Sequence, residues 1–180
     1  MNYRVSFILV VLVAIVGGYV VLFQLRDTGE VEPQNPWVYD ITFGDITGIK
    51  IRHRDDTQAF IRSESGWVFA DSNEPVDNDR WGGVPLLLTG PRSSRVLEEV
   101  VQDPASFGLD PPLTHIVITL RSGREIDLLI GDKTPDAGGS YVMVGGSPTL
   151  FTAPSDWTDV LTRLVIEPPH ISESTAEEAA

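Results

Sequence analysis

The residue types that most often carry out chemistry are few in this sequence and lie far apart. The histidines are His53, His115 and His170, and no two of them have the i, i+4 spacing of a helical metal site. His53 and His115 fall on predicted strands in different halves of the chain, so we interpret them as surface or half-buried residues. The chain has no cysteine, which excludes disulfides, thiolate metal sites and cysteine nucleophiles.

Acidic residues and one loop serine provide the other candidates for chemistry. The stretch Asp132–Asp136 resembles a calcium loop, but it lacks the Asp-x-Asp-x-Asp-Gly spacing and the distal glutamate. We interpret Glu98-Glu99 and Glu177-Glu178 as solvated charges, because adjacent residues in a strand point to opposite faces. Gly146-Ser147-Pro148 lacks the G-x-S-x-G frame of a hydrolase nucleophile, and no G-x-x-x-x-G-K-[ST] phosphate loop occurs.

Tryptophans could form an aromatic platform for a ligand. They are Trp37, Trp67, Trp81 and Trp157. Trp67 and Trp157 fit core positions by pattern, and Trp37 fits the interface of a membrane. From residue types and spacing, we predict no catalytic, cofactor-binding or metal-ligating residue, no cofactor and no enzymatic activity.

One apolar run near the start of the chain, Val5–Leu25, determines where the rest of the chain works. It is flanked by Arg4 and Arg26. A helix needs about 20 apolar residues to cross the hydrocarbon core of a bilayer, so the run predicts a transmembrane helix. A cleaved signal peptide is the competing interpretation, but its apolar core would be shorter, and no A-x-A-like site follows. Arg4 and the terminal amine favour a cytoplasmic N-terminus, which places the following domain outside the inner membrane.

The rest of the chain divides by composition into a linker (26–36), a folded domain (37–166) and an acidic tail (167–180) that we expect to be disordered. The chain has 26 acidic and 13 basic residues, a formal net charge of -13. This balance argues against nucleic-acid binding, which needs Lys and Arg to neutralise phosphates. It argues equally against docking of the domain on an anionic lipid surface.

Within the domain, apolar residues mainly alternate with polar ones, which is the period of half-buried strands. The segment Ile46–Ile51 resembles Leu113–Ile118, and the similarity continues from Ala59–Ile61 to Ile126–Leu128. These matches indicate a duplication. The alternative is a chance similarity between two hairpins that share the same alternating pattern.

We therefore predict an α+β fold, in which an N-terminal transmembrane helix is followed by a β-rich domain built from two similar strand-strand-strand-helix halves, 37–103 and 104–166. The clearest helix is Asp156–Val165, where Ser155 is the expected N-cap. The other helix follows Asp77 as N-cap. We expect it to be short or broken, because two glycines and a proline lie within it.

Several short motifs point to one bacterial family. They are Gly66-Trp67, Glu74–Asp77, Phe107–Pro112, Ile130–Asp132 and Ser140–Val142. Together with the N-terminal span, they resemble the family catalogued as domain of unknown function 4340, over almost the whole chain between the linker and the tail. The resemblance implies a membrane-anchored, β-rich protein for which no activity is established. Members often look like companions of transport systems related to gliding motility.

These observations predict a single-pass, membrane-anchored, non-catalytic accessory or scaffolding protein. Its extracytoplasmic domain would bind a membrane protein complex, for which a transporter is one candidate. The alternative is a binding module for a small molecule or a cell-wall component, which requires a concave pocket of about 300 Å³ or more with convergent polar groups. An enzyme of an unrecognised kind would need carboxylates or histidines gathered in one cleft, such as His53, His115 and Asp132.

Overall fold

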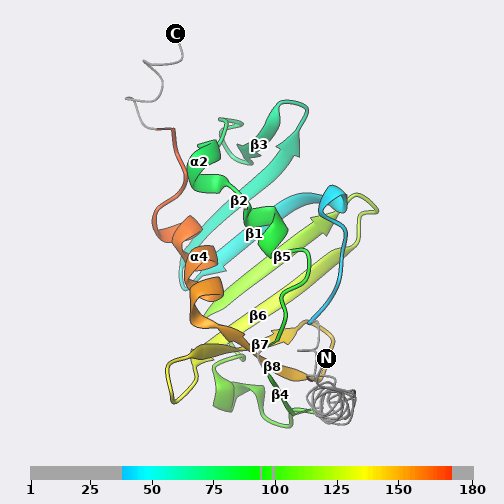
Figure 1. Cartoon of the computed structure of the whole chain (residues 1–180), viewed down its shortest axis with the longest axis vertical. Coiled ribbons are helices and arrows are strands. Elements are labelled where there is room, and N and C mark those ends of the chain that lie inside the picture. The colour runs from blue at the N-terminus through cyan, green and yellow to red at the C-terminus, as the bar shows by residue number, and fades with distance from the viewer. Residues whose placement is uncertain (1–37, 94, 99, 172–180) are drawn as a thin grey trace, which may run out of the picture. The chain divides into compact units, whose positions relative to one another are not determined.

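The computed structural model describes residues 38–93, 95–98 and 100–171 (Figure 1). The predicted membrane span Val5–Leu25 and the linker 26–36 lie outside the described residues. In the part of the chain that is described, no helix is long and apolar enough to cross a membrane. Residues 167–171, which belong to the predicted tail, lie against the domain, where the carbonyl of Pro169 accepts a hydrogen bond from the backbone N–H of Asp77 at 2.9 Å.

The described residues form one eight-stranded antiparallel sheet in the order β3-β2-β1-β5-β6-β7-β8-β4. Its strands are β1 (Ile46–His53), β2 (Asp56–Ser63), β3 (Gly66–Phe69), β4 (Arg95–Glu98), β5 (Thr114–Leu120), β6 (Glu125–Lys133), β7 (Gly139–Val144) and β8 (Leu150–Pro154). The helical segments are η1 (Phe43–Asp45), α2 (Asn78–Trp81), α3 (Val84–Leu87), η2 (Pro104–Phe107) and α4 (Ser155–Ile166). Along β5, buried and half-buried residues alternate strictly, as the sequence pattern predicts.

The predicted fold of two similar strand-strand-strand-helix halves is wrong. Strand β1 of the first half pairs with β5 of the second, and β4 of the first half pairs with β8 at the far edge, so both halves form a single sheet. In the first half, two one-turn α-helices are followed by strand β4, whereas in the second half four strands precede its one α-helix, α4. The physical reason lies in the strand edges, whose unpaired N–H and C=O groups are satisfied when β1 and β5 join.

The helices follow local sequence signals, with one exception. The Asp77 carboxylate accepts hydrogen bonds from the backbone N–H groups of Asp79 (3.0 Å) and Arg80 (3.4 Å), which confirms it as the N-cap of α2. The expected break follows at Gly83, which has a φ of 73°. The predicted N-cap of the last helix is wrong, because Ser155 already belongs to α4 and its hydroxyl donates to the carbonyl of Ala137 at 2.9 Å.

One face of the sheet, which we call the helix face, carries the main core and is covered by α2, α3 and α4 (Figure 1). At its centre, the ring of Phe60 lies 4.5 Å from that of Trp81 and 5.3 Å from that of Phe69. The fully buried residues of the sheet on this face include Ile49, Ile51, Phe60, Ile116, Ile118 and Leu128. These side chains come from β1, β2, β5 and β6, so the core joins both predicted halves.

The position of Phe60 corrects the sequence alignment of the two halves. Phe60 pairs with Ile49 on β1, and Leu128 pairs with Ile116 on β5. Phe60, rather than Ile61, therefore has the place that corresponds to Leu128. The shift arises because the β5–β6 turn is longer than the β1–β2 turn.

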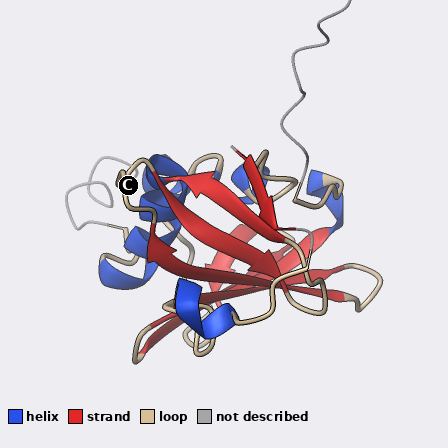
Figure 2. Cartoon of the chain, turned by 90° about the horizontal axis from the view of Figure 1, so that it is seen from below, coloured by secondary structure: helices blue, strands red, loops and turns tan. Residues whose placement is uncertain are grey.

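The opposite face is covered in part by the segment that contains η2, and Figure 2 shows helices on both sides of the sheet. The ring of Phe107, at the end of η2, meets that of Tyr141 on β7 edge-on at 5.0 Å. The backbones come so close that a Cβ added to Gly131 would collide with the carbonyl oxygen of Phe107. Gly131 therefore allows η2 to seat on β6.

Candidate functional site

The structure places the three histidines in separate environments. His53 lies at the end of β1, where its Nδ1 is 2.7 Å from the Thr114 hydroxyl. His115 lies on the opposite face, because it neighbours Thr114 on β5, and its Nε2 is 2.8 Å from Asp127 Oδ1. His170 stacks on the ring of Phe69 with the centroids 4.4 Å apart. Among the described residues, no group of three or more acidic residues and histidines is arranged to hold a metal ion.

Asp136, in the loop between β6 and β7, has a defined orientation. Its Oδ1 accepts a hydrogen bond from the Thr134 hydroxyl at 2.6 Å and another from the backbone N–H of Gly138 at 3.1 Å. The hydrogen bond from Thr134, followed by that from Gly138, lowers the pKa of Asp136. The carboxyl of Asp132 lies instead beside Gly108, so the two aspartates of the predicted loop belong to different surroundings.

The tryptophans within the described residues serve the fold. The rings of Trp67 and Trp81 pack together at 5.3 Å on the helix face. The indole N–H of Trp157 donates to the carbonyl of Leu87 at 3.1 Å, which joins α4 to α3. Trp37 lies outside the described residues, as does Glu99.

Two hollows of the surface could bind a partner or ligand. The first, which we call the helix groove, has a volume of about 290 Å³ and lies between α2, the start of α3 and α4. It is lined by Arg80, Val84, Val160, Arg163, Leu164, Glu167 and Pro169. The Arg80 guanidinium donates to the carbonyl of Glu167 at 2.9 Å, which holds one wall in place.

Exposed aliphatic side chains lie on the two helices, α3 and α4, that contribute to the helix groove. Leu86 on α3 is 62% exposed and Val160 on α4 is 40% exposed, and Leu87 is also exposed. The hydrogen bond from Trp157 to Leu87 fixes α3 against α4, so Leu86 and Val160 lie on helices that are held together. Apolar side chains that are exposed beside a concave groove are a feature of docking sites.

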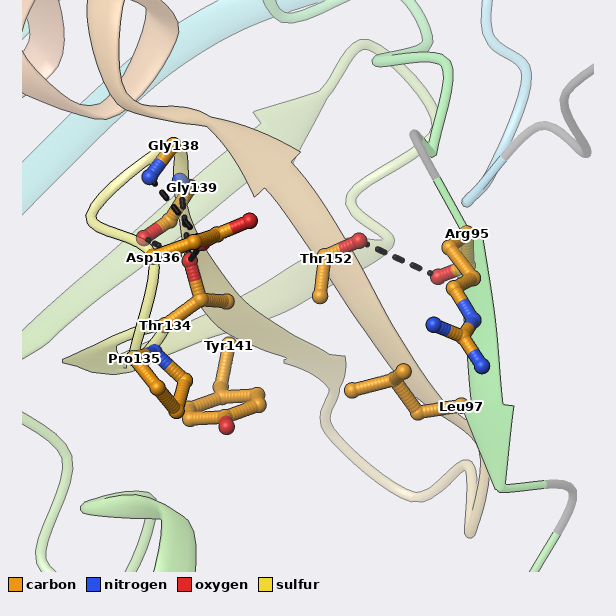
Figure 3. Close-up of a pocket in the computed structure, with 9 residues that line it drawn as sticks. All are labelled: Arg95, Leu97, Thr134, Pro135, Asp136, Gly138, Gly139, Tyr141 and Thr152. Carbon is orange, nitrogen blue, oxygen red and sulfur yellow. Dashed lines mark hydrogen bonds between the residues drawn. The ribbon is translucent and has the colours of Figure 1, made fainter.

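The second hollow, which we call the loop pocket, has a volume of about 590 Å³ and lies between β4 and the β6–β7 loop (Figure 3). It is lined by Arg95, Leu97, Thr134, Pro135, Asp136, Gly138, Gly139, Tyr141 and Thr152. It meets the size that the alternative prediction of a binding module requires. Sequence reasoning missed Arg95 and Tyr141, because the pairing of β4 with β8 that brings them together is non-local.

Comparisons with known proteins give one match. The sequence pattern of the family described as domain of unknown function (DUF4340) matches residues 67–164, which run from β3 to α4. No curated protein and no solved structure matches the chain.

Proposed function

The chain belongs to the DUF4340 family, and from this premise we propose that it is a non-catalytic accessory protein that binds a membrane protein complex through its folded domain. The apolar run Val5–Leu25 supports a single-pass anchor in the inner membrane, and Arg4 supports a domain outside the cytoplasm. A transporter is one candidate for the partner, on the resemblance of family members to companions of transport systems.

The observation that carries this proposal is the helix groove, together with the exposed aliphatic side chains on the helices α3 and α4 that form it. Fully burying a leucine or valine side chain contributes about 1.5–3 kcal/mol, and Leu86 and Val160 still expose much of their surface. A partner that covers both gains part of that free energy. The groove offers a concave seat for one further apolar side chain, because Val84 and Leu164 contribute to its wall.

Charge defines the kind of segment that fits the helix groove. Arg80 and Arg163 line it together with a single acid, Glu167, although the chain as a whole carries a net charge of -13. Within the described residues, the guanidinium of Arg163 makes no ion pair. The occupant we propose is therefore an amphipathic segment of the membrane-protein partner, with apolar residues facing Val160 and an acidic residue facing Arg163.

The experiment is purification of the full-length protein from its own membranes in mild detergent, with the co-purifying membrane proteins quantified. We expect Leu86→Asp and Val160→Asp to reduce the amount of the specific partner at least about fivefold, since central interface residues each contribute more than about 1 kcal/mol. Val100→Asp is the matched control, because Val100 is 58% exposed but lies outside the groove.

The charge of the groove is tested in the same way. We expect Arg163→Glu to release the partner and Arg124→Glu, on the β5–β6 turn, to retain it. Recovery of the protein as a monomer without a membrane protein across several detergents would contradict the proposal. So would equal recovery of the same partner with the groove variants and with the controls.

A further inference from the structure

The loop pocket is built across three neighbouring strands at the β4 edge of the sheet. Tyr141 pairs with Thr152, and Thr152 pairs with Arg95, so the three residues form one row on the same face. Neighbouring strands are about 4.8 Å apart, which puts the backbones of Tyr141 and Arg95 about 10 Å from each other. The floor of the pocket, from β7 to β4, is therefore about as wide as three extended residues of a peptide are long.

The two ends of the pocket carry opposite charges. Figure 3 shows Arg95 on the β4 side and Asp136 on the loop side, with Thr152 between them. Within the described residues, the guanidinium of Arg95 makes no hydrogen bond or ion pair. Its backbone is fixed, because the Ser93 hydroxyl and the Thr152 hydroxyl both donate to its carbonyl, at 2.8 and 3.3 Å.

The middle of the pocket combines apolar side chains with the hydroxyls of Tyr141 and Thr152. Leu97, Pro135 and the ring of Tyr141 line it, and the adjacent glycines of the loop add no side chain. The ring of Phe107 contacts the Tyr141 ring edge-on, with the centroids 5.0 Å apart. The hydroxyl of Tyr141 has no hydrogen-bond partner among the described residues, which leaves it available to a peptide group.

From this arrangement we infer that the loop pocket binds a short zwitterionic peptide, with the terminal carboxylate at Arg95, the terminal ammonium at Asp136 and an apolar side chain over Tyr141. The volume of about 590 Å³ lies within the range of ligand pockets. The site goes beyond the proposed function, because the helix groove lies on the other face of the sheet and contains none of these residues. Loss of either site therefore leaves the other testable.

The experiment uses the full chain in detergent micelles, titrated with the tripeptide Ala-Leu-Ala and followed by calorimetry. Two matched probes remove one charge each, because N-acetylation removes the ammonium and C-terminal amidation removes the carboxylate. We expect the free tripeptide to bind with a Kd below about 1 mM, and each capped probe to bind about tenfold more weakly.

Variants assign each end of the ligand to its residue. We expect Arg95→Gln to weaken the free tripeptide about tenfold while leaving the affinity of the amidated probe unchanged. Asp136→Asn should do the same for the free tripeptide and spare the acetylated probe. An unchanged melting temperature shows that each variant is folded, and Arg95→Lys should restore part of the affinity.

Three results would overturn the inference. The first is the absence of binding of Ala-Leu-Ala at about 10 mM. The second is equal affinity for the free and capped tripeptides, which would mean that the charged ends are not recognised. The third is an Arg95→Gln variant that weakens the free and the amidated probes by the same factor, which would give Arg95 a structural role only.

Discussion

Truncation of Phe60 to alanine tests the arrangement of the core on the helix face. Phe60 is 0% exposed, and its ring contacts those of Trp81 and Phe69 at 4.5 and 5.3 Å. Removal of a fully buried phenylalanine costs about 3–5 kcal/mol, since transfer free energy and a residual cavity both contribute. Because the two aromatic contacts are lost as well, we expect about 4 kcal/mol for Phe60→Ala.

The assay is urea unfolding of the full chain in mild detergent, followed by circular dichroism, with Ile61→Ala as the neighbouring control. Ile61 is 42% exposed, so we expect its truncation to cost only about 1–1.5 kcal/mol. A slip of one residue would exchange the faces on which the two side chains lie. If Ile61→Ala destabilises the protein as much as Phe60→Ala does, the reasoning about the register of β2 is refuted.

Three further expectations concern the opposite face, the histidine of β1 and the anchor. Gly131→Ala should destabilise the protein by about 1–3 kcal/mol through the collision with Phe107, whereas Gly44→Ala, which has open space around its Cβ position, should stay within about 0.5 kcal/mol in the same urea assay. Burial, with help from Arg54, lowers the pKa of His53, so the unfolded chain binds more protons as the pH falls from about 7 to 5 and stability decreases. The unfolding free energy of His53→Gln should therefore decrease less than that of the wild type over this interval, and an equal decrease would contradict the argument. Deletion of 5–25 should move the protein from the carbonate-washed membranes to the soluble fraction. Replacement of the run by an unrelated polyleucine span should keep the protein in the membranes. Membrane retention of the deletion variant would contradict the prediction of an anchor.

Most strands of the sheet, β4 excepted, could be predicted from sequence because their signal is local. Ile116 and Ile118 alternate with half-buried residues, and the turn after Leu120 contains a glycine, so β5 and β6 follow from period and turn chemistry alone. The N-cap of α2 could be predicted in the same way, because the Asp77 carboxylate accepts hydrogen bonds only from backbone N–H groups two and three residues further along the chain. Ser155 shows the limit of this approach, because its hydroxyl is used by Ala137 of a separate loop.

The sheet order and the candidate sites could not be predicted, because they depend on pairings between distant segments. Strand β4 is mostly exposed and has no alternating apolar pattern, and it is a strand because β8 offers it an edge. The loop pocket depends on that pairing, which brings Arg95 into the row with Tyr141. The alignment of Ile61 with Leu128 fails for a similar reason. Both faces of β2 show the same periodicity of two, and only the pairing with β1 determines which face of β2 is buried.

The most direct measurement of the central claim, that the helix groove binds a membrane-protein partner, is site-specific photo-crosslinking in intact cells. A photoreactive residue at Val160 is compared with one at Val100, which is exposed but lies outside the groove. We expect one discrete adduct with a membrane protein from position 160, which disappears with Arg163→Glu, and none of that adduct from position 100. No adduct at 160, or the same adduct at both positions, would contradict the account.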